Sequence, residues 1–330
     1  MKTIITKGEV AFILPLFLVI NLIGCDNSYD SGHIEEKSDT IIVERMETPV
    51  SFEDTTDAKE TYSSPSVDPE LNAEINELDE STKEVSLDPD WEYAELSVIN
   101  DGNSVLYHAN DNPNGIIVAV NAGHGTKGGQ LSKTYCHPDK SPKVTGGTTE
   151  EGAIKAVAVS GGMTFADGTK ESIVTLRLSE FLRDALLESG YDVLMVRDAE
   201  DVQLDNVART VIANNTADCL ISVHWDGDNL NYDKGCFYIS TPNGIKDMEP
   251  VALHWEEHEK LGVSLIEGLK TVGCKIYGDG KMNIDLTQTS YSTIPSVDIE
   301  LGNAISSHGD ETLKKQANGL LFGIDLFFEQ

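Results

Sequence analysis

The sequence predicts an α/β fold in which a twisted sheet, mostly parallel or mixed, is flanked by helices on both faces of a single domain. Two observations support this prediction. Short apolar runs rich in β-branched residues alternate along the chain with longer segments whose apolar residues recur at helical spacing. Continuous apolar runs are typical of strands that are buried on both faces, as in a sheet packed between helix layers.

The individual elements follow from these patterns. The first buried strand is 116–121, and the clearest helix is 171–189, which has an apolar stripe and the stop signal Gly190. Residues 91–115 alternate around an Asn100-Asp101-Gly102 turn, so we expect a lead-in hairpin there. The remaining elements are expected, in order, at strand 191–196, helix 204–214, strand 219–223, strand 235–240, helix 251–272, strand 296–299 and helix 311–328.

The N-terminal residues have the features of an export signal. Lys2 and Lys7 precede an apolar run of 14 residues, 10–23. A membrane-spanning helix needs about 20 residues, so this length favours a signal peptide. The run ends in Leu22-Ile23-Gly24-Cys25, which resembles the lipobox of bacterial lipoproteins. This resemblance implies that residues 1–24 are a cleaved lipoprotein signal peptide. It also implies that a lipid on Cys25 anchors the extracytoplasmic protein to the cell membrane.

The next segment is strongly acidic. Residues 26–90 contain 20 Asp and Glu against 4 Lys and Arg, so they carry half of the formal net charge of −32. They are rich in Ser and Thr and lack sustained apolar periodicity, which predicts a disordered tether over 25–90. A self-repelling acidic chain is extended and would hold the folded domain away from the membrane. The charge also argues against a nucleic-acid partner.

Residues able to bind metal or move protons come at the ends of the predicted strands. His124 and His224 follow two of them, Glu300 follows a third, and Glu171 opens the long helix. Because the carboxyl ends of parallel strands meet at one edge of a sheet, these groups are expected to converge. Two imidazoles and one carboxylate are a usual ligand set for catalytic zinc, and a further carboxylate can carry a proton. The pattern therefore indicates metal-assisted hydrolysis.

The order and surroundings of these residues resemble the zinc-dependent N-acetylmuramoyl-L-alanine amidases (amidase type 3), which cleave the peptidoglycan of the bacterial cell wall. The resemblance covers about 116–328 and rests on Ala122-Gly123-His124-Gly125, the helix from Glu171, Val196-Arg197-Asp198, Arg209, Ser222-Val223-His224, and Pro295-Ser-Val-Asp-Ile-Glu300-Leu-Gly302.

This resemblance implies that residues 116–330 are a catalytic domain whose substrate is peptidoglycan. It implies Zn²⁺ as the cofactor, held by His124, Glu171 and His224, with Glu300 as the catalytic acid and base. The expected reaction is hydrolysis of the amide between N-acetylmuramic acid and L-alanine. The loop 126–168 is long, and its Glu150 and Glu151 remain alternatives to Glu171 as the third ligand.

Two other functions are considered. His254-Trp-Glu-Glu-His258 matches the H-x-x-E-H pattern of inverzincin metallopeptidases, and its two histidines would share one helix face. A catalytically inactive, wall-binding lipoprotein is the second alternative. The retained set of His124, His224 and Glu300 argues against it.

The cysteines beyond Cys25 have no assigned chemistry. Four of them permit three disulfide connectivities, and Cys219, on a buried strand, is expected to be a free thiol. The other three are Cys136, Cys236 and Cys274. His137 lies beside Cys136 in the long loop, and the sequence suggests no role for it.

Overall fold

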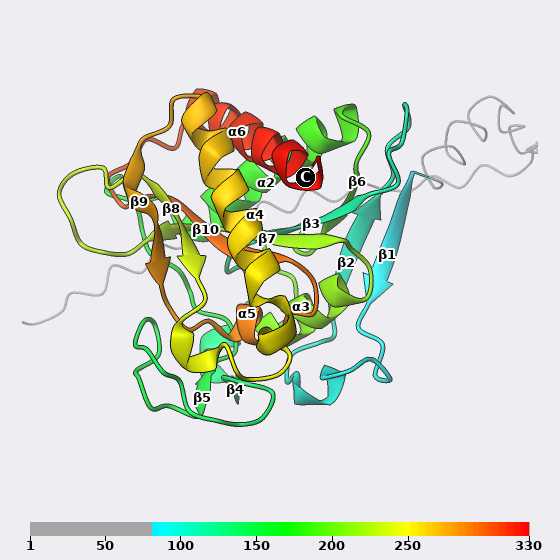
Figure 1. Cartoon of the computed structure of the whole chain (residues 1–330), viewed down its shortest axis with the longest axis vertical. Coiled ribbons are helices and arrows are strands. Elements are labelled where there is room, and N and C mark those ends of the chain that lie inside the picture. The colour runs from blue at the N-terminus through cyan, green and yellow to red at the C-terminus, as the bar shows by residue number, and fades with distance from the viewer. Residues whose placement is uncertain (1–80, 330) are drawn as a thin grey trace, which may run out of the picture. The chain divides into compact units, whose positions relative to one another are not determined.

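The computed structural model describes residues 81–329, which contain an eight-stranded mixed sheet with the order β1-β2-β6-β3-β7-β10-β8-β9. Figure 1 shows β1 and β9 at the opposite edges of this sheet. The expected signal peptide, Cys25 and the tether up to residue 80 lie outside the described residues. The strands are β1 (Thr82–Ser86), β2 (Asn103–Tyr107), β3 (Ile117–Ala122), β6 (Asp192–Met195), β7 (Cys219–Asp226), β8 (Cys236–Ser240), β9 (Ile276–Asn283) and β10 (Ser296–Asn303).

The centre of the sheet is parallel. β3 pairs in parallel with both β6 and β7, and β10 pairs in parallel with β7. β8 runs antiparallel to β10, and β2 runs antiparallel to β6, so the mixed pairs lie toward the edges. The carboxyl ends of β3, β7 and β10 therefore lie side by side, which is the edge where ligands bind in open α/β sheets.

Helices cover both faces of the sheet, as predicted. In β3, Val118 and Val120 belong to a core formed with α2 (Glu171–Glu188), α4 (Val251–Thr271) and α6 (Asp310–Phe328). Ala119, between them, belongs to the core on the other face with α3 (Asn206–Asn214). Successive side chains of a strand point to opposite faces, so one continuous apolar run contributes to both cores. None of the helices in 81–329 is both long enough and apolar enough to cross a membrane.

The predicted boundary between tether and hairpin is wrong. β1 lies at 82–86, inside the range assigned to the tether, and it pairs antiparallel with β2, so Thr82 faces Tyr107. The segment between the two strands contains a 3₁₀ turn, Ala94–Leu96, instead of the first strand of a hairpin. Val85, Leu87 and Trp91 pack against the second core. The strand β1 was not predicted because it lies in an acidic segment, where too few apolar residues alternate to give a clear period.

Four further elements were missed. β9 pairs in parallel with β8 at an edge of the sheet, and its Gly278 and Gly280 gave no strand signal. The short helix α5 (Thr287–Tyr291) follows it and packs beside α3. Within the long loop 126–168, β4 (Lys133–Tyr135) and β5 (Lys155–Val157) form a small antiparallel pair. This loop is therefore an ordered part of the fold.

Candidate active site

His124, Glu171 and His224 converge at the carboxyl edge of the central strands. His124 follows β3, His224 lies near the end of β7, and Glu171 is the first residue of α2. His124 Nε2 is 2.8 Å from Glu171 Oε1 and 3.1 Å from His224 Nδ1, and the same glutamate oxygen is 3.2 Å from His224 Nδ1. Among the described residues, these three form the one cluster that could hold a metal ion.

The spacing and orientation of the three atoms fit a zinc ion. Tetrahedral zinc with bonds of about 2.0–2.1 Å places neighbouring ligand atoms roughly 3.3 Å apart, close to the distances found here. His124 Nδ1 lies 2.9 Å from the Ser160 carbonyl oxygen, to which it donates, so the lone pair of Nε2 faces the cluster. Glu171 Oε1 accepts from the Trp225 N–H at 3.0 Å, and its Oε2 accepts from the Met163 N–H at 2.7 Å.

Two glycines make this close approach possible. A Cβ on Gly123 would lie 2.3 Å from Cε1 of His224, and one on Gly162 would lie 2.7 Å from Cδ2 of His124. Gly162 also has a φ of 76°, and His124 itself has a φ of 65°, which is uncommon for a residue with a side chain. Such strained backbone gathers at functional sites, where the surrounding contacts hold it in place.

Two buried arginines hold the turn that carries His124. Arg209 donates to the carbonyl oxygen of His124 at 2.7 Å, and Arg197 donates to that of Gly123 at 3.1 Å. Burial lowers the pKa of Arg197 to about 10 and that of Arg209 to about 9, so both remain charged at neutral pH. The sequence indicated these arginines only as part of the family pattern; the structure gives them a role in fixing the backbone at the site.

The three residues of the cluster change one another's pKa values. Burial would raise the pKa of Glu171, but the hydrogen bonds from His124 and His224 lower it far below its usual range. Burial also lowers the pKa of His124. The pKa of His224 is raised to about 9 because its hydrogen bond to Glu171 and the charge of Asp298 outweigh burial. The glutamate is thus ionised and ready to accept a cation.

Glu300 and Asp298 extend from β10 beside this cluster. Glu300 is the register partner of His224 and lines the same pocket, and its Oε2 has no hydrogen-bond partner among the described residues. Burial raises the pKa of Glu300 to about 8 and that of Asp298 to about 6. Asp298 Oδ2 lies 3.7 Å from His224 Nε2. The sequence prediction missed Asp298, although its place two residues before Glu300 put it on the same face of the strand.

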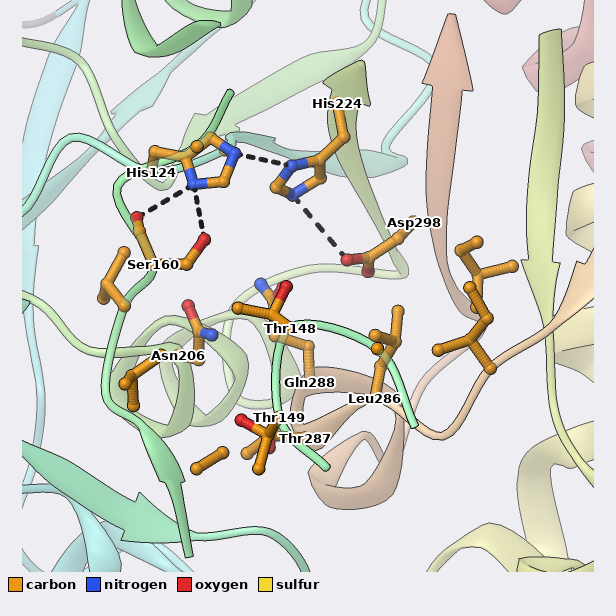
Figure 2. Close-up of a pocket in the computed structure, with 18 of the residues that line it drawn as sticks. His124, Thr148, Thr149, Ser160, Asn206, His224, Leu286, Thr287, Gln288 and Asp298 are labelled. Carbon is orange, nitrogen blue, oxygen red and sulfur yellow. Dashed lines mark hydrogen bonds and ion pairs between the residues drawn. The ribbon is translucent and has the colours of Figure 1, made fainter. Parts of the chain in front are cut away.

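These groups line a pocket with a volume of about 780 Å³. Figure 2 shows His124, His224 and Asp298 on one side of it, and Thr148, Thr149, Leu286, Thr287 and Gln288 on the other. A pocket of this size is typical of small-molecule and cofactor sites, which occupy roughly 300–1,000 Å³. It places three side chains that could hold a metal and a separate carboxylate at one surface, as hydrolysis assisted by a metal requires.

The alternative ligands do not join this cluster. Glu150 and Glu151 are exposed in the long loop, outside the group formed by His124, Glu171 and His224. His258 is buried, its Nδ1 accepts the Ser296 N–H at 3.0 Å, and burial lowers its pKa to about 3. The rings of His254 and His258 are 6.5 Å apart, and no third ligand joins them in the described part of the chain. The four cysteines of this part are free thiols, as expected for Cys219.

Comparison with known families decides the relationship. The family described as N-acetylmuramoyl-L-alanine amidase matches residues 118–320, which is more than half of the chain. The chain belongs to this family. The resemblance found in the sequence is thereby confirmed, and the assignment as an N-acetylmuramoyl-L-alanine amidase is supported. The match begins in β3 and ends in α6, so it contains all the residues of the candidate site.

Solved structures of amidases have the same fold. The N-acetylmuramyl-L-alanine amidase Ami1 from Mycobacterium smegmatis is similar with a TM-score of 0.55 and 18% identity, over 66% of this chain and 99% of that one. The apo form of Ami1 from Mycobacterium abscessus has a TM-score of 0.52 and 19% identity, over 65% of this chain and 99% of that one. At such identities the likeness concerns the fold. Among curated protein sequences, none matches.

Proposed function

We propose that this amidase uses zinc to hydrolyse the amide between N-acetylmuramic acid and L-alanine in peptidoglycan. The observation that carries the proposal is the convergence of His124 Nε2, His224 Nδ1 and Glu171 Oε1, whose mutual distances are 2.8–3.2 Å. This set of two imidazoles and one carboxylate leaves a coordination position for water or substrate, as catalytic zinc sites do.

The three ligand side chains would hold the ion, and their other hydrogen bonds fix the orientation of these side chains. When bound, zinc supplies a Lewis acid that lowers the pKa of a water molecule and polarises the substrate carbonyl. Ser160 fixes the tautomer of His124 through its Nδ1. Asp298 faces Nε2 of His224 at 3.7 Å and favours a proton on that nitrogen, which leaves Nδ1 to face the cluster.

Glu300 is the proton carrier in this proposal. Its carboxylate would accept a proton from the attacking water and then give it to the nitrogen of the departing L-alanine. A pKa raised by burial to about 8 lies near neutrality, which suits a group that must both accept and donate a proton. A cation at the neighbouring ligands would favour the ionised form that the first step needs.

The test compares the full chain with two variants, Glu300→Ala and His224→Ala. Zinc per chain and the release of L-alanine amino termini from purified peptidoglycan are both measured. The proposal expects zinc in wild type and Glu300→Ala, zinc lost from His224→Ala, and amine release by wild type alone. Zinc retained in His224→Ala but lost on changing His254 would contradict the ligand set. Zinc bound without any cleavage would favour the inactive, wall-binding alternative.

We also propose that a lipid on Cys25 keeps the protein at the outer face of the cell membrane, close to its substrate. The support is the lipobox-like Leu22-Ile23-Gly24-Cys25 after a short apolar run. A Cys25→Ala variant should be released from the membrane fraction at physiological salt. Its retention there would contradict the proposed anchor.

A further inference from the structure

The side of the pocket opposite the two histidines is formed in part by the long loop 126–168, to which the sequence analysis assigned no role. Residues 143–149, here named the loop wall, contribute Lys143, Gly147, Thr148 and Thr149 to its lining. The segment 284–288, which runs from the end of β9 into the first turn of α5, lines the pocket beside them. Figure 2 shows Thr148 and Thr149 on a stretch of chain that faces the two histidines across the pocket.

Asp285 fastens the loop wall to the body of the domain. Its Oδ2 accepts the Val144 N–H at 2.8 Å, and its own N–H donates to Thr145 Oγ1 at 2.8 Å. The ammonium group of Lys143 donates to its carbonyl oxygen. Three consecutive residues of the loop wall are therefore held by this one aspartate.

A buried histidine completes the attachment. His137 Nε2 lies 2.9 and 3.0 Å from the two carboxylate oxygens of Asp285, and neither side chain has any solvent exposure. His137 Nδ1 is 2.8 Å from Ser141 Oγ, so the histidine bridges the loop and the segment before α5. Leaving a buried carboxylate without its hydrogen-bond partner is strongly unfavourable. The loop wall is consequently a fixed part of the pocket.

Four polar side chains on this side are neutral and uncommitted, whereas Gln288 donates to Ser222 and the carboxylate of Asp285 is engaged by His137. Those of Thr148, Thr149, Thr287 and Asn206 line the pocket, and none of them makes a hydrogen bond to another described residue. The nearby cation Lys143 is engaged with Asp285. The strand-end side, by contrast, carries the carboxylates of Asp298 and Glu300. A substrate group with hydroxyl and amide functions and no negative charge is complementary to this arrangement.

We propose that the loop wall is a subsite for the N-acetylated sugar of the substrate, bound through the hydroxyl groups of Thr148 and Thr149 and positioned by Asp285. The proposal rests on the proposed function, because that function defines the substrate as a sugar joined to a peptide. The sugar carries neutral hydroxyl and acetamido groups. The stem peptide ends in a carboxylate, and the loop wall offers it no free cation because Lys143 is engaged with Asp285, so the wall fits the neutral sugar better.

The experiment uses the double variant Thr148→Val/Thr149→Val of the full chain, which removes two hydroxyl groups and keeps the shape. Two substrates share one scissile amide: N-acetylmuramoyl-L-alanyl peptide, and lactoyl-L-alanyl peptide, which lacks the sugar ring. We expect KM for the first to rise roughly tenfold with little change in kcat, since two hydrogen bonds are lost. KM for the second should not change. Thr271→Val, an exposed threonine of α4 outside the pocket, is the matched control.

A second measurement separates this subsite from the reaction. The neutral disaccharide N,N′-diacetylchitobiose is titrated into wild type and the double variant. Weaker binding by the variant supports the subsite, and equal binding or none would overturn it. An equal KM rise for both substrates, or a rise for neither, would overturn it as well. If wild type cleaves neither substrate, the proposed function fails, and the titration alone decides the subsite.

Asp285→Asn tests the positioning role. We expect it to raise KM for the sugar-containing substrate and leave the zinc content and the KM for the lactoyl peptide unchanged. A loss of activity equal on both substrates would mean that Asp285 serves stability alone.

Discussion

Two buried histidine–carboxylate pairs lie at this pocket, and they differ in what surrounds them. His124 Nε2 is 2.8 Å from Glu171 Oε1, and His137 Nε2 is 2.9 Å from Asp285 Oδ1. The first pair faces a second imidazole, His224, and lies at the ends of two central strands. The second pair is fully enclosed between the long loop and the segment before α5.

The difference lies in the atoms left uncommitted. Both oxygens of Asp285 are engaged, by His137 and by the Val144 N–H, and no further ligand atom of the described residues converges on them. At the first pair, three ligand atoms point at one another. The other ring nitrogen of His124, Nδ1, donates to the carbonyl oxygen of Ser160. Residue types alone therefore do not make a metal site. The candidate metal site is distinguished by the convergence of its ligand atoms, and the second pair is a structural attachment.

The largest expected effect is on zinc binding, which should depend on the first pair and its neighbour His224 but not on the second pair. We expect His224→Ala to weaken zinc binding by more than about 100-fold, because a ligand matters more than the outer partners that already contribute 10–100-fold. Amidase activity should fall with it. His137→Ala should keep one zinc per chain. Metal analysis after dialysis checks both, and zinc lost from His137→Ala would break the distinction drawn here.

The next effect isolates the proton carrier from the ligands. Glu300→Gln should retain zinc and lower kcat roughly 10²- to 10⁴-fold, the usual contribution of a general acid and base. The amide keeps the size of the side chain but cannot carry a proton. Metal content and steady-state kinetics on peptidoglycan fragments check this. Near-normal kcat would assign the proton transfer to another group.

The enclosed pair should affect stability. Asp285→Asn should lower the free energy of unfolding by about 3 kcal/mol at pH 7, because it leaves the buried ammonium group of Lys143 without its counter-charge. Urea unfolding monitored by fluorescence measures this. Asp167→Asn, which removes an exposed partner of His308, should have no measurable effect and serves as the control. Equal stabilities of wild type and Asp285→Asn would contradict the attachment role.

The same pair predicts a pH dependence. Although burial acts against it, the hydrogen bond from His137 lowers the pKa of Asp285. The aspartate therefore stabilises the folded protein fully above its ordinary pKa of about 4, and this stabilisation is lost as the pH falls through the lower folded value. The stability difference between wild type and Asp285→Asn should shrink below about pH 4. A difference that grows on acidification would contradict this assignment.

The smallest effect is expected in α4, whose His254 and His258 match a metallopeptidase sequence motif. His254→Ala should change neither the zinc content nor amidase activity, because His258 uses its Nδ1 to accept the Ser296 N–H and no third ligand joins the two in the described residues. Metal analysis and the peptidoglycan assay check this. Loss of zinc would move the site to α4.

Much of the fold was predictable from the sequence because buried parallel strands and amphipathic helices have distinct periods. The strand at 116–121 was found at 117–122 and the helix at 171–189 was found at 171–188. The order of the strands explains why His124, Glu171 and His224 could be grouped in advance: parallel neighbours bring their carboxyl ends together. The short strand β1 and the edge strand β9 were missed because their apolar periods are weak.

The tertiary structure decided which groups surround each histidine. His124, His137 and His258 are all buried, so burial alone does not separate a candidate metal ligand from an attachment or a core acceptor. The partner of His137 is 148 residues away, and that of His258 is 38 residues away. Such pairs are set by how loops and helices pack, which local periodicity does not encode. The sequence by itself determined the sheet, its edge and the residues delivered there; packing determined which lone pairs remained available.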